Sequence, residues 1–335
     1  MKRMKYEKLL RLLAAMILVT LLSGAALSPA RAESDPGAWP ALNEAGFLDS
    51  GEFVYEDPEA GIWRYCSETL KVEVIRRTET DPIKLRWYDA EVWSRKETFG
   101  TVTNKPDKHF SEADWPQAVC SKNGAVLAIN ADYACHRWGH THNKKERYRV
   151  GIMLRNGEIK SEWTKPAGNT GVPNLDTLAI YPDGNMEVYN SDELTAQEYV
   201  DKGAWDVMAF GPWLIRDGEL NPLLPKYESK YNNYRAPRTA IGMIEPGHYI
   251  AIMAEGRLKE SKGITMTRLA EKMKERGCVC ALNMDGGETS CIMFMGKQIC
   301  KVDAGNRYGY ARKESEFLAI GTSLLVEGYL PPEER

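Results

Sequence analysis

The chain has 335 residues, of which 43% are hydrophobic and 27% charged, and its 44 Lys and Arg against 47 Asp and Glu give a net charge of −3. This length and hydrophobic content can bury a large core, which suits one large domain or two small ones. The acidic balance provides no excess of positive charge to hold a polyanion, so nucleic acid is excluded as the expected partner.

The first 32 residues are typical of a cleaved export signal. A basic start is followed by an apolar run from Leu12 to Leu22 and by Ala30-Arg31-Ala32, a small-x-small cleavage site. The run is shorter than the roughly 20 residues of a membrane-spanning helix, so we expect cleavage rather than anchoring. Cleavage would remove six positive charges and one negative charge and shift the net charge to about −8. These features predict a soluble protein, secreted or on the exterior of the cell envelope, with no stable membrane span.

The remaining chain is expected to form an irregular acidic leader at 33–60, one domain at 61–328 and a tail at 329–335. Apolar and polar residues alternate over 62–76 and over 83–92, with the period of half-buried strands. The domain should therefore begin with two strands that pair as neighbours.

A helix is expected next, with Asp114 as its N-cap, Pro116 in its first turn and its end at Asn123-Gly124. A buried strand at 125–130 follows at once. Turn dipeptides between alternating apolar runs then predict hairpins at Asn156-Gly157, Asp183-Gly184, Asp217-Gly218 and Pro246-Gly247. This part of the domain should be mostly antiparallel sheet.

Two further helices are predicted by their ends. Thr195 with Glu198 forms a capping box for a short helix that ends at Gly203. A second helix begins after Thr265 and ends at Gly277, and a short apolar strand, 278–284, comes directly after it. The pattern as a whole predicts an α+β fold, a strand-rich single domain of mixed sheets with a few packed helices.

The strongest chemical signal is the stretch 281–290, in which a strand ends in Asp285 and the loop continues with Gly286 and Gly287. Glycines after a strand let a backbone approach a ligand closely, so sites are often built at such places. The alternative is a tight turn in which Asp285 caps its own backbone. Two other stretches favour a site: 128–133 also ends a buried strand in polar residues, and 236–242 places an arginine just before a strand.

Together these three stretches resemble the phosphodiester glycosidase family. The similarity extends from Tyr65 to Leu325, with further pieces in the family's order at 152–159, 210–220, 255–263 and 294–297. The resemblance implies a hydrolase that cuts a sugar-1-phosphodiester bond, of the N-acetylglucosamine-1-phosphate type, in a phosphorylated glycan or envelope polymer. No cofactor is required by the sequence, and a role for a divalent ion stays open.

The resemblance also implies site residues. Asp285 and Asp132 would supply the carboxylates, with Glu288 as a third candidate, because loss of a phosphate builds positive charge on the sugar. Arg238 could hold the phosphate through two parallel N–H donors, with the Gly286 and Gly287 amides as an anion nest. Asn130 and Asn283 would hold sugar hydroxyls. The full set of expected substrate- and phosphate-binding residues is Arg238, Thr239, Asn130, Asn283, Gly286, Gly287 and Ser290.

Glu288 departs from the family pattern, which usually has glycine there. It would be either an extra acid or a group that repels phosphate. A non-catalytic protein that binds glycans or the envelope is therefore an alternative function, and a phosphodiesterase that cuts the P–O bond is another.

A histidine-rich segment, 135–142, follows the Asp132 strand. Its His-x-His spacing suits zinc or copper, but no fourth ligand accompanies it, so no metal site is assigned. The basic stretch 136–149, with Trp138, could instead be a loop at the pocket rim that attracts a phosphorylated glycan, or a solvated loop.

All seven cysteines follow the export signal, and an odd number leaves at least one without a partner in the chain. If Met295-Gly296 is a two-residue turn, Cys291 and Cys300 face each other in a non-hydrogen-bonded pair, at a spacing that a disulfide accepts. A shift of the turn to Gly296-Lys297 would put the two cysteines out of register. Both a bridge and two neighbouring thiols are consistent with the sequence.

Overall fold

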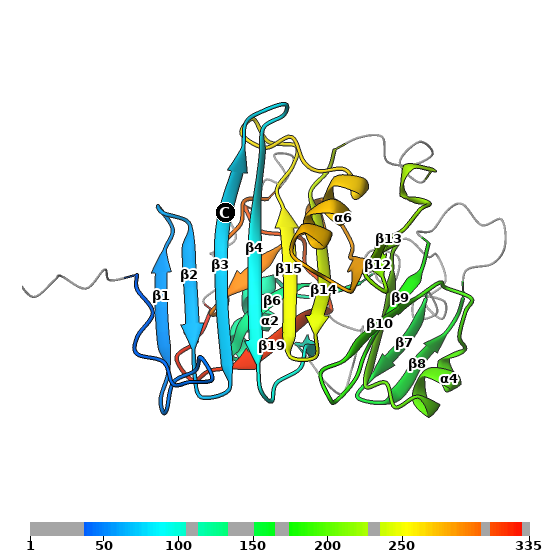
Figure 1. Ribbon diagram of the computed structural model, residues 1–335, viewed down its shortest axis with the longest axis horizontal. Helices are drawn as coiled ribbons and strands as arrows, with labels where there is room; N and C mark the ends of the chain where they lie inside the picture. Colours follow the sequence, from blue (N-terminus) through cyan, green and yellow to red (C-terminus); the bar gives the residue numbers. More distant parts are fainter. Residues whose placement is uncertain are drawn as a thin grey trace, which may run out of the picture. The chain divides into compact units, whose positions relative to one another are not determined.

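The computed structural model describes residues 37–104, 113–132, 151–164, 174–226, 235–302 and 309–329. Residues from Pro40 onward form one unit of three antiparallel sheets with a few helices, which confirms the predicted strand-rich α+β fold (Figure 1). The expected export signal and the histidine-rich segment lie outside the described residues. Within the described part of the chain, no helix is both long and apolar enough to span a bilayer.

The largest sheet has nine strands, in the order β1 (Phe53–Asp57), β2 (Ile62–Cys66), β3 (Leu70–Glu79), β4 (Leu85–Ser94), β15 (His248–Ala254), β14 (Arg238–Glu245), β16 (Cys280–Asn283), β12 (Trp213–Arg216) and β13 (Glu219–Leu220). The pairing of β3 with β4 is as predicted. The run 62–76 is not one strand, because the Ser67 hydroxyl accepts hydrogen bonds from the Thr69 and Leu70 amides and turns the chain between β2 and β3. Part of the stretch expected to be irregular forms β1, which pairs with β2.

The two smaller sheets have five strands each. One has the order β10 (Met186–Tyr189), β9 (Asp176–Ile180), β11 (Asp206–Phe210), β7 (Ile152–Arg155) and β8 (Glu158–Glu162). The other has the order β18 (Lys297–Gln298), β17 (Ile292–Phe294), β6 (Ala125–Asn130), β19 (Glu316–Thr322) and β5 (Gly100–Thr103). The four predicted hairpins are confirmed, since their turn dipeptides connect β7 to β8, β9 to β10, β12 to β13 and β14 to β15.

The predicted helix ends are mostly correct. The capping box of Thr195 and Glu198 opens α4 (Ala196–Asp201), and the Thr195 hydroxyl accepts from the Glu198 amide. The Thr265 hydroxyl caps α6 (Met266–Glu275) in the same way. The N-cap of α2 (Pro116–Lys122) is Trp115 rather than Asp114, because the Asp114 backbone forms a β-bridge with Glu314.

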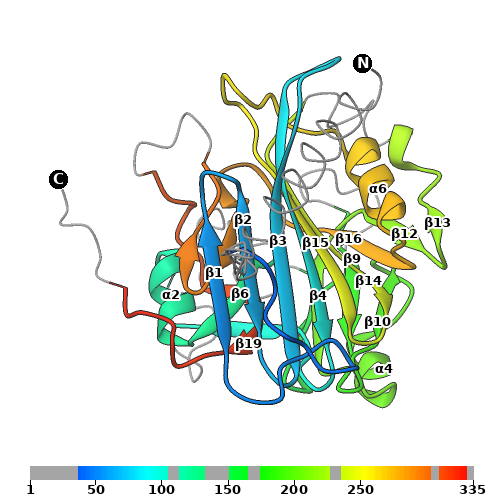
Figure 2. The same ribbon diagram turned by 60° about the vertical axis from the view of Figure 1, so that its left-hand side comes forward.

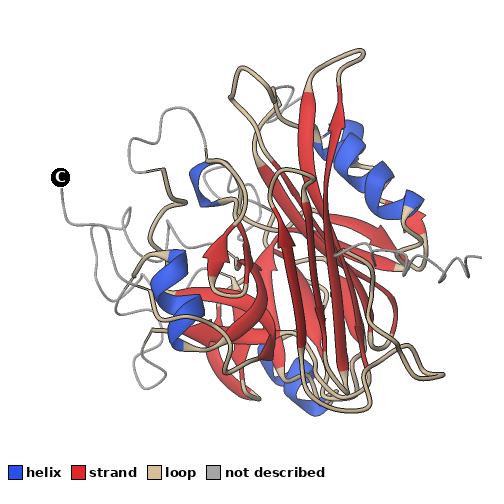
Figure 3. Cartoon of the chain, turned by 90° about the vertical axis from the view of Figure 1, so that its left-hand side faces the viewer, coloured by secondary structure: helices blue, strands red, loops and turns tan. Residues whose placement is uncertain are grey.

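The large sheet is covered on both faces. Figures 2 and 3 show α6 on one face and the sheet of β6, β17 and β19 on the other. Leu269 and Met273 of α6 pack against Ile250 and Ile252 of β15 in one apolar cluster. The opposite face belongs to a larger cluster that includes β6 and β19. This layering buries the ends of β6 and β16, where the polar residues of the site begin.

Candidate active site

Asp285 is the centre of a buried group of polar side chains. Its carboxylate accepts a hydrogen bond from the Gly286 amide at 2.8 Å and another from the Thr289 hydroxyl at 3.2 Å. The Arg312 guanidinium lies 3.6 Å from its Oδ2 atom. Burial raises the pKa of Asp285 to about 6, and Arg312 opposes that rise. Asp285 therefore changes charge close to neutral pH.

The two glycines after Asp285 shape this loop. Gly287 has φ 68°, a left-handed conformation that side chains rarely adopt, and a Cβ on Gly286 would stand 3.1 Å from the Pro237 carbonyl. The Gly286 amide donates to Asp285 and the Gly287 amide donates to the Pro237 carbonyl. Both amides already donate to acceptors within the chain, so in this conformation they do not form the expected anion nest. The tight turn in which Asp285 caps its own backbone is present.

Asn130, at the end of β6, holds the Asp285 loop from the other sheet. Its Nδ2 atom donates to the Asp285 carbonyl at 2.9 Å, and its Oδ1 atom accepts from the Cys291 amide at 3.1 Å. Asn283 braces a second loop, with its Nδ2 atom 2.9 Å from the Gly211 carbonyl. Both side chains were expected to hold sugar hydroxyls. In this structure the Asn130 amide and the Asn283 Nδ2 atom fix the backbone of the site, and the Asn283 Oδ1 atom is buried without a hydrogen-bond partner among the described residues.

Asp132, two residues after Asn130, belongs to a buried ion network. Its Oδ2 atom accepts from the Ala209 amide at 2.8 Å and lies 3.6 Å from the Arg155 guanidinium. Arg155 has no exposed surface and forms a two-point pair with Glu316. Burial disfavours the charge of Arg155, but Glu316 and Asp132 outweigh it and raise the pKa. The charge of Asp132 in turn raises the pKa of Asp285, so the structure brings these two predicted residues into one electrostatic group.

Arg238 starts β14, whose register with β16 places its backbone beside that of Asp285. Its guanidinium is buried and its Nε atom donates to the Ile264 carbonyl at 3.0 Å. Two other guanidinium groups lie at the Asp285 loop, those of Arg312 and Arg257. The exposed guanidinium of Arg257 lies 3.6 Å from where a Cβ of Gly287 would stand.

The other predicted residues divide by exposure. The Glu288 side chain is exposed, and its backbone carbonyl accepts a hydrogen bond from the Arg312 amide at 2.9 Å. Thr239 and Ser290 are buried, and neither hydroxyl has a hydrogen-bond partner among the residues that the structure describes. Glu288 thus differs in exposure from Asp285, which is buried.

Sequence reasoning missed Glu314, which is 1% exposed. No hydrogen bond of good geometry from the described residues reaches either carboxyl oxygen, although the Thr289 hydroxyl lies beside the carboxyl. Burial first, and then the charge of Asp285, raises the pKa of Glu314 well above its usual value. The signal in the sequence was a carboxylate two residues before the buried strand β19.

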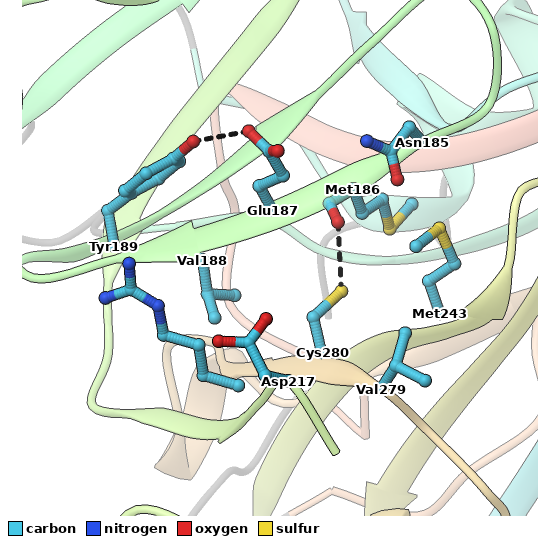
Figure 4. A pocket seen from close by; sticks show the side chains of 10 residues that line it. Asn185, Met186, Glu187, Val188, Tyr189, Asp217, Met243, Val279 and Cys280 are labelled. Carbon is cyan, nitrogen blue, oxygen red and sulfur yellow. Dashed lines mark hydrogen bonds between the residues drawn. The ribbon is translucent and has the colours of Figure 1, made fainter. Parts of the chain in front are cut away.

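A cavity of about 270 Å³ lies where β10 faces β16 and contains none of the predicted residues (Figure 4). Two of its charged groups already have partners: Glu187 accepts from Tyr181 and Tyr189, and Arg216 pairs with Glu193. The described residues include no cluster of His, Cys, Asp and Glu that could hold a metal ion.

The predicted hairpin register is confirmed. Phe294 pairs with Lys297 across a Met295-Gly296 turn, and Met295 accepts φ 48°. The Ile299 amide donates to the Ile292 carbonyl, so Cys291 and Cys300 face each other in the next pair outward. Both are buried free thiols in this structure.

Comparisons with known proteins identify the family of the chain. The model of the phosphodiester glycosidase family matches residues 123–326, more than half of the chain. An uncharacterised prophage-derived protein of Bacillus subtilis, YomE, is 31% identical over 189 residues, and mouse N-acetylglucosamine-1-phosphodiester alpha-N-acetylglucosaminidase is 30% identical over 95. These alignments cover 56% and 25% of this chain, but only 27% and 18% of the relatives.

Two solved structures share the fold. The catalytic domain of the zebrafish N-acetylglucosamine-1-phosphodiester alpha-N-acetylglucosaminidase, auto-inhibited by its pro-peptide, has a TM-score of 0.57 at 16% identity, over 77% of this chain and 85% of that one. A hypothetical protein from Synechocystis has a TM-score of 0.50 at 12% identity, over 76% of this chain and 62% of that one. At these identities the likeness concerns the fold alone.

Proposed function

The chain belongs to the phosphodiester glycosidase family, and on that premise we propose that it is a secreted hydrolase that cuts a sugar-1-phosphodiester, of the N-acetylglucosamine-1-phosphate type, in a phosphorylated glycan or envelope polymer. The observation that carries the proposal is the pairing of a buried, titratable Asp285 with the Arg312 guanidinium 3.6 Å away. This places one carboxylate and one cation at the same loop.

These two charges suit the two halves of the substrate. When the bond between the anomeric carbon and the phosphate oxygen breaks, positive charge builds on the sugar and negative charge on the phosphate. Ionised Asp285 stabilises the sugar and Arg312 stabilises the phosphate. Arg257, exposed beside Gly287, supplies a second guanidinium on the solvent side of the loop.

The alternative of a non-catalytic glycan-binding protein was based on Glu288 standing where the family has glycine. The Glu288 side chain is exposed, whereas Asp285 and Glu314 are buried, so Glu288 does not add a buried charge. No observation favours that alternative over hydrolysis.

The test is to incubate the purified chain with an aryl N-acetylglucosamine-1-phosphate diester, with and without chelator, in isotopically labelled water. We expect free sugar that carries the labelled oxygen, with or without chelator. Label in the phosphate product would instead mean P–O cleavage, and no turnover together with retained glycan binding would favour the non-catalytic alternative. Wild type and Asp285→Asn are compared at equal folded concentration, and only the wild type should release sugar.

A further inference from the structure

We infer that Glu314 is an uncharged carboxyl at the active site, whose ionisation would close the site to an anionic phosphodiester. The inference rests on the proposed function for the identity of the ligand. Glu314 is a positioning residue: it acts through the charge of the site and does not need to contact the reacting atoms.

The geometry around Glu314 favours the neutral form. The residue is 1% exposed, and no hydrogen bond of good geometry from the described residues reaches its two oxygens. An ionised carboxylate in such a place is very unfavourable unless hydrogen bonds and an opposite charge surround it. The salt bridge of Arg312 is made with Asp285. Of the two carboxyl groups, Asp285 and Glu314, it is therefore Glu314 that keeps its proton.

The groups around Glu314 come from several elements. Asp285 follows β16, Asp132 follows β6, and both raise the pKa of Glu314 through their negative charges. Arg312, on the same segment as Glu314, lowers it, as does the Thr289 hydroxyl. Cys291, at the start of the β17 hairpin, is a buried thiol whose own pKa the charge of Glu314 helps to raise, after burial and Cys300. Burial and the negative neighbours together raise the pKa of Glu314 more than Arg312 and Thr289 lower it.

The combined charge of Asp285 and Glu314 decides which ligands the site can bind. With Asp285 ionised and Glu314 neutral, the Arg312 cation balances one carboxylate, and a singly charged phosphodiester meets no net repulsion. Ionisation of Glu314 would add a second negative charge beside the phosphate, where burial weakens solvent screening. Binding of an anionic substrate should thus fall in two steps as pH rises: first near 6, where Asp285 ionises, and again at the higher pKa of Glu314.

The test measures affinity against pH for two ligands with the same sugar, a non-hydrolysable N-acetylglucosamine-1-phosphodiester and an uncharged N-acetylglucosaminide. In wild type, the anionic ligand should lose affinity in both steps, by about tenfold for each pH unit above the pKa of Glu314. The uncharged ligand should show no upper step. Glu314→Gln keeps the neutral shape, so it should bind the anionic ligand without the upper step and with the lower step intact. Glu327→Gln, which changes an 80% exposed side chain, is the matched control and should behave as wild type.

An infrared titration of the wild-type chain gives a readout that needs no ligand. A protonated buried carboxyl band should persist at neutral pH and be missing in Glu314→Gln. Its absence from wild type would overturn the inference even if the chain is an active glycosidase. An upper step of the same size in Glu314→Gln would also overturn it. Failure to bind either sugar ligand, with the infrared band present, would refute the proposed function. The inference that Glu314 is a neutral carboxyl would still hold.

Discussion

Asn130 and Asp285 lie 155 positions apart, yet the Asn130 side-chain amide donates to the Asp285 main-chain carbonyl at 2.9 Å. The same side chain accepts from the Cys291 amide, so one residue at the end of β6 fixes both sides of the glycine loop. The position of the catalytic candidate therefore depends on contact between two different sheets.

Asn130→Ala should destabilise the fold and reduce turnover together. The change leaves a buried carbonyl and a buried amide without partners, at a cost of about 2–3 kcal/mol in the free energy of unfolding. Asn221→Ala is a matched control, because Asn221 makes the same two kinds of contact, to the Trp213 carbonyl and from the Leu223 amide, in another loop. Urea unfolding should show similar losses in the two variants, with activity lost only in Asn130→Ala. Full activity in both would argue against a role for this brace.

Asp285→Asn should abolish turnover and raise stability above pH 6. The pKa of Asp285 is raised in the folded state, so its contribution to stability is fully present below the unfolded pKa and is lost as pH rises through about 6. Asparagine does not ionise, so at neutral pH the variant should be more stable than wild type by about 2–3 kcal/mol. Thermal unfolding followed from pH 4 to pH 8 checks this. If the difference in stability between the two proteins does not grow over this range, ionisation of Asp285 does not destabilise the fold.

Arg155→Met should be strongly destabilising. It leaves Glu316 and Asp132 buried without their cation, and loss of one partner of a buried pair costs about 3–5 kcal/mol. Arg216→Met breaks the partly exposed pair with Glu193 and should cost less than about 1 kcal/mol. Denaturant midpoints of the two variants give the comparison, and equal midpoints would mean that the buried network contributes little.

Local signals in the sequence predicted most elements correctly, because a turn or cap is fixed by a few adjacent residues. The Asn156-Gly157 hairpin and the Thr195 and Glu198 capping box are examples. The same reasoning found Asp285 from its strand and glycines. It missed Glu314 because that residue is surrounded by segments far away in the chain, among them the Asp285 loop and Asp114, with which its backbone forms a β-bridge. No adjacent residue marks such a contact.

Gly287→Ala tests whether the glycine loop serves the site or only the turn. Gly287 has φ 68°, so alanine should cost about 1–2 kcal/mol in backbone strain. Gly277→Ala is the control, since Gly277 has φ 86°, ends α6 and has open space around its missing Cβ. The two variants should lose similar stability, but only Gly287→Ala places a methyl group beside the Arg257 guanidinium and should lower kcat/KM. Equal activities would limit Gly287 to a structural role.

The last prediction concerns Cys291 and Cys300, which face each other in a non-hydrogen-bonded pair of the β17–β18 hairpin. Such pairs have Cα atoms about 4.5 Å apart, within the range that a disulfide accepts. Burial raises the pKa of Cys300 to about 12 and that of Cys291 well above its usual value, so the folded thiols should react slowly. A bridge would then have to form while the hairpin is still open.

We therefore expect the Cys291–Cys300 disulfide in protein that is exported to an oxidising compartment. Protein made in a reducing compartment should keep the two free thiols. The exported form should be more stable by about 2–3 kcal/mol, because the bridge restricts the unfolded chain. Mass mapping without reductant decides the matter through a cross-linked peptide that contains both cysteines. Cys66, a buried thiol in another sheet, serves as an internal reference for alkylation on unfolding. Alkylation of both Cys291 and Cys300 in the unfolded, unreduced exported protein would show that the facing thiols stay unpaired.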